Sequence, residues 1–262
     1  MARLDNKILI ITGGTQGIGE ATALYAAENG AAGIIICGRQ EEKGAAVAAA
    51  VQKLGCECEY VRADLSVVED CRNVVKRCDE RFGRVDGLAN IAADTRRMDF
   101  DDCTPEFWDY QYALNVRGPF LLMQDSVRIM KREKIPGSIV NISSVASFCG
   151  LPTLAAYSST KGAINALTKN TANSLRQFRI RVNAITLGWT DTPGEHHIQT
   201  KEDGRPENWL EIAEKISPWG RIIKCDETAR LVGYLLSDES GIMSGSLVDL
   251  AHAVVGVFPQ DT

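Results

Sequence analysis

The sequence predicts an α/β protein built on a doubly wound parallel sheet of about seven strands, with helices on both faces. Short apolar runs alternate with amphipathic stretches of helix length along most of the 262 residues, and no Pro- or Ser-rich linker divides them. Crossover connections between such strands make the strands parallel and place helices on both faces of the sheet. At this length we expect residues 1–262 to form a single domain.

The expected strands are short and mostly aliphatic. They cover Lys7–Thr12, Gly33–Cys37, Glu57–Arg62, Val85–Ala92, Ser138–Ser143, Ile180–Thr186 and Ser246–Leu250. The expected helices carry apolar residues at helical spacing, as at Val47, Val51 and Leu54. They cover Gly17–Asn29, Gln40–Leu54, Val67–Phe82, Pro105–Arg132 with an interruption near Gly118-Pro119, Ala155–Phe178 and Cys225–Leu236.

The segment of about residues 187–222 departs from this alternation. We expect a long irregular insertion that serves as a lid or substrate loop. A surface excursion packed by its own tryptophans is the alternative. His196, His197, Lys201 and Arg205 are candidate contacts for a polar substrate, with solvated loop charges as the alternative, and Leu151, Leu154 and Trp189 are candidate apolar walls.

Composition argues against several classes of protein. The net charge is −5 and the pI near 5.4, which disfavours nucleic-acid and anionic-membrane partners because these favour a basic face. No apolar run has the roughly 18 residues of a membrane span, and the first residues lack a signal-peptide pattern. We therefore expect a cytoplasmic protein. Its eight cysteines show no CxxC or HxxxH spacing, so we expect reduced thiols and no metal site.

A glycine-rich turn, TGGTQGIG, lies between the first expected strand and the first expected helix. Glycines allow a tight turn and close approach to a pyrophosphate. The helix then directs its free N–H groups at the phosphates. The turn predicts a dinucleotide site, and a plain strand–helix turn is the alternative. Its candidate cofactor contacts are Gly13, Gln16, Gly17, Ile18 and Gly19.

The second expected strand ends at Cys37-Gly38-Arg39-Gln40, where an NAD site usually offers an acidic residue and an NADP site offers Arg. The Arg39 guanidinium suits a 2′-phosphate. We therefore favour NADP as the cofactor, with NAD as the alternative if Arg39 is only a solvated surface residue.

Tyr157 and Lys161 lie four residues apart in an expected helix, and so on one helical face. A nearby ammonium favours the phenolate, which lets tyrosine exchange a proton with an alcohol or a ketone. Ser144 lies 13 residues earlier, where its hydroxyl could hold a substrate oxygen. Asn115 is an unusual residue within a long expected helix. Each of these residues also has an ordinary structural interpretation when taken alone.

In order and spacing, the glycine-rich turn, Asp64, Asn90, Asn115, Ser144, Tyr157 and Lys161 resemble the classical short-chain dehydrogenases/reductases, which have a Rossmann-like fold. The resemblance covers nearly the whole chain. It implies that Tyr157 is the catalytic acid/base and that Ser144 positions the substrate oxygen. It also implies that Lys161 binds the nicotinamide ribose and lowers the pKa of Tyr157, while Asn115 holds a helix kink and a water of the proton relay.

The same resemblance implies several cofactor contacts. Asp64 and Leu65 would contact adenine, and Asn90 would line the cofactor cleft. Gly188, Thr190 and Thr192 match the loop on the nicotinamide side. Two positions depart from the family pattern: the usual Asn-Asn-Ala-Gly is Asn90-Ile91-Ala92-Ala93, and the usual Pro-Gly is Leu187-Gly188. These departures affect the shape of the cleft and the mobility of the loop, but they remove no catalytic group.

The resemblance implies an NAD(P)-dependent oxidoreductase that interconverts a secondary alcohol and a ketone. We expect a small polyol, sugar or hydroxy/keto compound as substrate, and a homo-oligomer, tetramer or dimer, as the assembly. Reduction of a 3-oxoacyl thioester and an aldehyde–alcohol reaction are alternatives within the enzyme class. A non-catalytic nucleotide-sensing interaction protein is the alternative from another class, because fold alone does not fix function.

Overall fold

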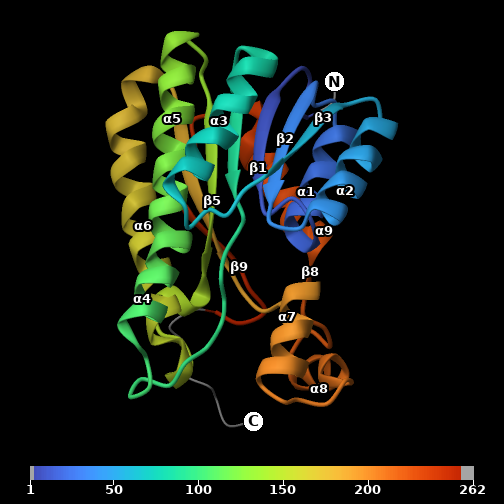
Figure 1. The fold of residues 1–262 in the computed structure, drawn as a ribbon, viewed down its shortest axis with the longest axis vertical. Helices are drawn as coiled ribbons and strands as arrows, with labels where there is room; N and C mark the ends of the chain where they lie inside the picture. Colours follow the sequence, from blue (N-terminus) through green and yellow to red (C-terminus); the bar gives the residue numbers. More distant parts are fainter. Residues whose placement is uncertain (1–2, 255–262) are drawn as a thin grey trace.

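The computed structural model describes residues 3–254, and its centre is a seven-stranded sheet in the order β3-β2-β1-β4-β5-β6-β9 (Figure 1). All six strand pairs of this sheet are parallel. The predicted doubly wound parallel fold is therefore confirmed. The strands are β1 (Ile8–Thr12), β2 (Gly33–Gly38), β3 (Glu57–Arg62), β4 (Gly87–Asn90), β5 (Ser138–Ser144), β6 (Arg181–Leu187) and β9 (Leu247–Leu250).

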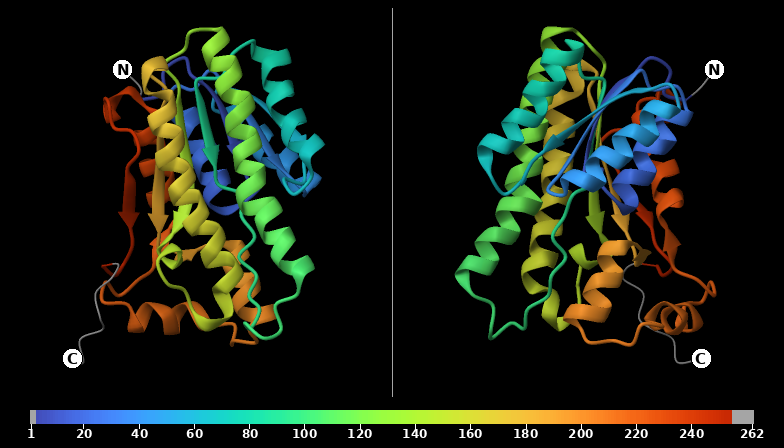
Figure 2. Two further views of the ribbon diagram at one scale, coloured as in Figure 1. Left: turned by 90° about the vertical axis from the view of Figure 1, so that its left-hand side faces the viewer. Right: turned by 45° about the vertical axis from the view of Figure 1, so that its right-hand side comes forward.

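Two layers of helices cover the sheet, because alternate residues of each strand point to opposite faces. Helices α1 (Gly17–Glu28), α2 (Glu41–Lys53) and α9 (Cys225–Leu236) pack on one face. Helices α3 (Val68–Phe82), α5 (Gly118–Arg132) and α6 (Ala155–Leu175) pack on the other (Figure 2). In β1, for example, Ile11 joins the first core and Ile10 joins the second.

The long helix expected over Pro105–Arg132 is interrupted earlier than Gly118-Pro119. Helix α4 (Pro105–Tyr112) is followed by a π-helical turn at Ala113–Arg117, and α5 begins at Gly118. Pro119 lies in the first turn of α5, where its missing N–H costs little. The irregular backbone instead surrounds Asn115, whose side chain bonds outside its own helix.

The segment expected to be irregular, residues 187–222, is helical over half of its length. It contains β7 (Thr190–Asp191), α7 (Pro193–His197), a π-helical turn (Ile198–Glu202) and α8 (Trp209–Ile216), and β7 pairs with β8 (Ile223–Lys224). Its own small core holds Trp209, Ala213 and Ile222, with Trp189 packed against them. Two tryptophans of the segment, Trp189 and Trp209, thus pack within it, while Trp219 is 69% exposed.

Five of the eight cysteines are buried, and all eight are free thiols. Cys71 and Cys78 lie on the buried face of α3, and Cys37 lies at the end of β2. Cys149 is the exposed one of the eight. Within residues 3–254, no helix is both long enough and apolar enough to cross a membrane.

The Thr12 side chain fixes the end of β1 to the loop that follows β4. Its hydroxyl oxygen accepts hydrogen bonds from the backbone N–H groups of Ile91 (2.8 Å) and Ala92 (3.0 Å). The hydroxyl lies 3.3 Å from the Ala89 carbonyl, to which it donates. Because Thr12 is buried, no water can replace it as the acceptor for these N–H groups.

We therefore expect Thr12→Val, which keeps the shape and removes the hydroxyl, to lower the free energy of unfolding by roughly 3 kcal/mol, since two buried N–H groups lose their acceptor. Thr12→Ser keeps the hydroxyl and should cost only about 1 kcal/mol for the lost methyl group. Urea unfolding of both variants checks this. Equal losses in the two variants would contradict the role given to the hydroxyl.

Candidate active site

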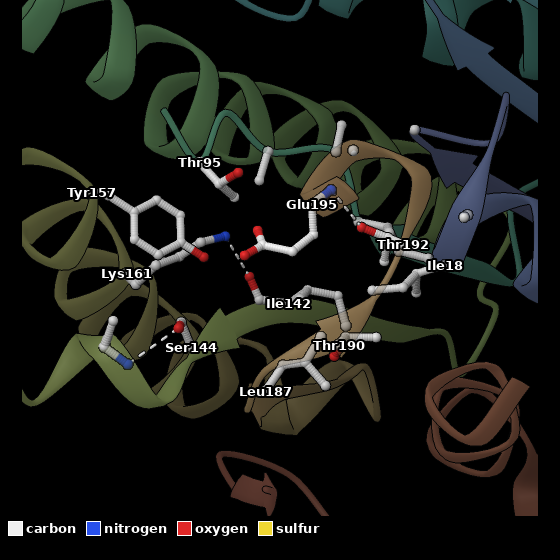
Figure 3. Close-up of a pocket in the computed structure, with 18 of the residues that line it drawn as sticks. Ile18, Thr95, Ile142, Ser144, Tyr157, Lys161, Leu187, Thr190, Thr192 and Glu195 are labelled. Carbon is white, nitrogen blue, oxygen red and sulfur yellow. Dashed lines mark hydrogen bonds between the residues drawn. The ribbon is translucent and has the colours of Figure 1, made fainter. Parts of the chain in front are cut away.

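A cavity of about 840 Å³ lies at the carboxyl edge of the sheet. The ends of several parallel strands, the glycine-rich turn, the first turn of α6 and the segment around α7 contribute to its wall. Ligands of doubly wound sheets bind at this edge. Figure 3 shows Tyr157, Lys161 and Ser144 on one side of the cavity and Glu195 on the other.

The glycine-rich turn has the shape of a phosphate cradle. Gly13 and Gly17 have φ angles of 66° and 60°, in the left-handed region that favours glycine. A Cβ atom on Gly19 would lie 2.1 Å from the Gly13 carbonyl oxygen. The N-cap Gln16 makes no side-chain hydrogen bond to the start of α1, so the first N–H groups of that helix remain available to an anion. The turn therefore fits a dinucleotide pyrophosphate.

Two cations lie where the 2′-position of an adenosine ribose is expected. Arg39 is exposed at the end of β2, lines the cavity and donates to the Tyr110 hydroxyl at 3.2 Å. Lys43 donates to the Gln16 side-chain oxygen at 2.7 Å, which brings a second cation to the turn. No sequence pattern marks Lys43 as a candidate cofactor contact, because its proximity to Gln16 depends on how α2 packs.

Asp64 and Leu65 both line the cavity, as expected. The Asp64 carboxylate accepts hydrogen bonds from the Ser66 backbone N–H (2.9 Å) and hydroxyl (2.7 Å). Burial by itself would raise the pKa of Asp64, but the Ser66 hydrogen bonds, together with the charges of Arg39 and Arg62, lower it below its usual value. The carboxylate is therefore ionised at neutral pH.

On the nicotinamide side, Gly188, Thr190 and Thr192 line the cavity. The Thr192 hydroxyl oxygen accepts from the Glu195 backbone N–H (2.9 Å) and caps α7. The prediction that Asn90 lines the cofactor cleft is wrong. Its side chain lies below the cavity wall, where it donates to the Asn141 side-chain oxygen (2.8 Å). The wall at this point is made by the three residues that follow, residues 91–93.

Tyr157 and Ser144 both line the cavity. Ser144 is the last residue of β5, and its hydroxyl oxygen accepts from the Ala146 backbone N–H at 3.1 Å. The pKa of Tyr157 is raised to about 12, mainly by burial of the phenol; the Ser144 side chain opposes the rise, and the negative charge of Glu195 contributes to it. Tyr157 is therefore a protonated donor at neutral pH.

Lys161 is 3% exposed, and its ammonium donates to the Ile142 carbonyl at 2.8 Å. Its Nζ atom lies 5.5 Å from the centroid of the Tyr157 ring. Burial lowers the pKa of Lys161 to about 8. Burial of the phenol is the largest influence on the pKa of Tyr157 and raises it, and the expected lowering by Lys161 stays a prediction.

Asn115 lies behind the cavity wall. Its side-chain N–H₂ group donates to Asp94 O (2.9 Å), Gln111 Oε1 (2.8 Å) and Thr160 Oγ1 (3.3 Å). Its Oδ1 atom accepts from the Asp94 backbone N–H at 2.8 Å. Asn115 thus joins the π-helical turn to α6 and to the loop after β4, in agreement with the expected position at a helix irregularity.

The sequence interpretation missed the wall opposite Tyr157. Glu195, Arg97 and Gln199 line it, and no motif marks them because they meet only when α7 folds toward the loop after β4. Of the candidate substrate contacts, Arg205 lines the cavity, and so do the candidate apolar walls Trp189, Leu151 and Leu154. His196 instead accepts from the Trp209 indole N–H at 2.9 Å, while Lys201 pairs with Glu207.

The lowered pKa of Lys161 predicts a pH-dependent stability. Below pH 8 the lysine is charged in both the folded and the unfolded chain, and its buried charge is destabilising; as the pH rises above 8, only the folded chain loses the proton, so stability rises. Lys161→Met should therefore be stabilising at pH 7. Its advantage over the wild type should shrink by about 2 kcal/mol by pH 9.5.

Urea unfolding of the protein without cofactor at the two pH values measures this difference. The control is Lys169→Met, since Lys169 is an exposed lysine of the same helix that also donates to a backbone carbonyl. The same pH trend in both variants would refute the assignment to Lys161.

Comparison with known proteins agrees with this geometry. The family model of short chain dehydrogenases matches residues 7–203. An oxidoreductase of Thermotoga maritima is 34% identical over 94% of this chain and 96% of its own length. A 3β-hydroxysteroid dehydrogenase of Mediterraneibacter gnavus is 31% identical over 95% of this chain and 94% of its own.

Similarity extends to solved structures. The crystal structure of an actinorhodin polyketide ketoreductase variant with NADPH is 25% identical and has a TM-score of 0.89, with 98% of this chain and 100% of that chain covered. The sheet order, the cavity at its carboxyl edge and the family match lead to one conclusion. The chain belongs to the short-chain dehydrogenase/reductase family, whose members are NAD(P)-binding oxidoreductases that act on CH–OH groups.

Proposed function

We propose that the protein is an NADP-dependent oxidoreductase that interconverts a secondary alcohol and a ketone, with Tyr157 as the acid/base. The observation that carries this proposal is that Tyr157, Ser144 and Lys161 lie together on one side of the same cavity. A hydroxyl pair at this position suits a substrate oxygen that changes between carbonyl and alcohol.

In this proposal the nicotinamide cofactor supplies the hydride that converts a carbonyl carbon to an alcohol carbon. Ser144 donates a hydrogen bond to the substrate oxygen and holds it beside Tyr157. Tyr157, protonated at neutral pH because its pKa is about 12, gives its proton to that oxygen during reduction. Alcohol oxidation needs the phenolate, so a higher pH favours it.

Lys161 and Asn115 complete the proposed machinery. The Lys161 ammonium donates a hydrogen bond to the Ile142 carbonyl in this structure. With the cofactor bound, it would bind the ribose hydroxyls and bring positive charge to the Tyr157 phenol. Asn115 would serve as a positioning residue. Its hydrogen bonds hold the π-helical turn and the Asp94 backbone beside the first turn of α6.

We assign the cofactor contacts to cavity-lining residues. The N–H groups of the glycine-rich turn, including Gly17 and Gly19, would hold the pyrophosphate, and Asp64 and Leu65 would contact the adenine. Thr190 and Thr192 would lie beside the nicotinamide. Arg39, with Lys43 nearby, would bind a 2′-phosphate, and the related ketoreductase solved with NADPH supports this choice of cofactor.

For the substrate we propose a small polyol, sugar or hydroxy/keto compound. Charged and polar side chains, Glu195, Arg97 and Gln199, line the wall opposite Tyr157. Apolar residues, Leu151 and Leu154, line another part of the cavity. A polar wall favours a substrate with hydroxyl groups over the long alkyl chain of a 3-oxoacyl thioester, which is the second candidate.

Tyr157→Phe should lower kcat by about 10²- to 10⁴-fold, because the variant lacks the proton donor, and should leave the affinity for NADPH unchanged. Cofactor-linked absorbance with a screened ketone measures turnover, and quenching or enhancement of NADPH fluorescence measures binding. The control is Tyr234→Phe in α9, which does not line the cavity. Turnover of Tyr157→Phe near the wild-type rate would eliminate Tyr157 as the acid/base.

Arg39→Asp should reverse the preference for NADPH over NADH, because the variant places a negative charge beside the 2′-phosphate. Loss of a charge-assisted contact should lower the ratio of the two affinities by about 10- to 100-fold. Fluorescence titration with both nicotinamides measures it. The control is Arg62→Asp, an equally exposed residue outside the cavity wall; the same change in both variants would point to long-range charge instead of a contact.

A further inference from the structure

The two oxygens of the Glu195 carboxylate have different surroundings. Oε1 accepts three hydrogen bonds, from Trp189 Nε1 (2.8 Å), Arg97 Nη2 (3.0 Å) and Gln199 Nε2 (2.6 Å). Among residues 3–254, no group donates a hydrogen bond to Oε2. Figure 3 shows that the carboxylate points into the cavity, on the side that faces Tyr157. Oε2 is therefore a fixed acceptor without a protein partner.

Two more groups of the same wall lack partners. Gln199 is 1% exposed, and its Oε1 atom is buried without a hydrogen bond, because its N–H₂ group is directed at Glu195. The Arg97 Nε atom is also buried and unpartnered. Because these two atoms have almost no solvent-accessible surface, a ligand in the cavity cannot reach them directly. The acceptor that the wall offers to a ligand is therefore the Glu195 carboxylate, which points into the cavity.

The charges of the wall indicate the kind of ligand. Arg97 is paired with both Glu195 and Asp203, so its charge is already matched by carboxylates. The Lys161 ammonium is directed at the Ile142 carbonyl, and Arg205, a further cation of the cavity lining, has an exposed side chain. The free carboxylate oxygen that points into the cavity favours a ligand group that donates a hydrogen bond.

We propose that Glu195 is the specificity-determining residue of the substrate site, and that its Oε2 atom accepts a hydrogen bond from a donor, hydroxyl or ammonium, on the carbon next to the reacting carbonyl. This inference rests on the proposed function, because Tyr157 and Ser144 fix where the reacting oxygen lies. Glu195 is thus assigned to substrate selection and not to proton transfer.

The three donors on Oε1 make Glu195→Gln an informative variant. They require an acceptor, so the amide oxygen of the new side chain takes the place of Oε1. The amide N–H₂ group then takes the place of Oε2 and presents a donor to the cavity. The substitution keeps the shape of the wall and reverses the polarity of the group that meets the substrate.

Four ketones of similar size test the reversal. At the carbon beside the carbonyl, 3-hydroxybutan-2-one carries a donor and acceptor, 3-aminobutan-2-one a cationic donor, 3-methoxybutan-2-one an acceptor, and 3-methylbutan-2-one neither. We would measure kcat/KM for reduction of each. We would also measure binding of each by calorimetry, with the protein saturated by the oxidised form of its preferred cofactor, so that no reaction occurs.

The wild type should favour the hydroxy or the amino ketone over the methyl ketone by about 10- to 100-fold, the range of a hydrogen bond to a charged group. The better of the two identifies the donor as hydroxyl or ammonium. Glu195→Gln should lose this preference, should lose the amino ketone most, and should gain affinity for the methoxy ketone. Glu211→Gln, an exposed charge change on α8, should behave as the wild type.

Three outcomes would overturn the inference. The first is that the wild type binds the hydroxy, amino and methyl ketones equally well or binds none of them measurably. The second is that Glu195→Gln loses affinity equally for all four ketones, and the third is that Glu211→Gln shows the same loss of affinity as Glu195→Gln. Failure of the proposed function is a separate result. In that case no ketone is reduced, yet the binding preference and its loss in Glu195→Gln persist.

Discussion

The parallel hydrogen-bond ladder is the constraint on which the site depends. Because β4, β5 and β6 run parallel and in register, with Asn90 opposite Asn141 and Ser144 opposite Leu187, their carboxyl ends emerge side by side. Each end leads to a different part of the cavity wall. A shift of one residue in β5 would turn Ser144 to the other face of the sheet and separate it from Tyr157.

Desolvation then sets the chemistry of the groups that the ladder brings together. Burial moves the pKa of Tyr157 up to about 12 and the pKa of Lys161 down to about 8, so both groups move toward their neutral forms. The Glu195 side chain pairs with Arg97, and its negative charge contributes to the raised pKa of Tyr157. A positive charge added to the site would therefore have a large effect on the pKa of the Tyr157 phenol.

The sequence predicted the fold and brought together Ser144, Tyr157 and Lys161, which line one side of the cavity. Strand–helix alternation predicted the sheet. Ser144 was expected at the end of a strand, and Tyr157 and Lys161 were expected on one face of a helix because they are four residues apart. Local pattern placed elements less exactly where tertiary contacts decide. The interruption of the long helix lies at the π-helical turn around Asn115, whose partners include the backbone of distant Asp94.

The opposite wall shows the same limit. Glu195 and Arg97 are 98 positions apart, and nothing in their local sequence marks them as a pair. The helices of the 187–222 segment are held by the Trp189, Trp209 and Ile222 core, which a short-range pattern does not reveal. Asn90 was misplaced because strand position alone does not show that its side chain bonds to Asn141 within the sheet.

The distribution of the cysteines has a consequence for chemical modification. Burial raises the pKa of Cys37 and Cys58 to about 12 and that of Cys71 to about 11, so almost no thiolate exists at these core positions, and thiolate is the reactive form. Cys149 is exposed and lies in the cavity wall. An alkylating probe would therefore label the mouth of the cavity long before the core, and its rate would report whether a ligand covers that mouth.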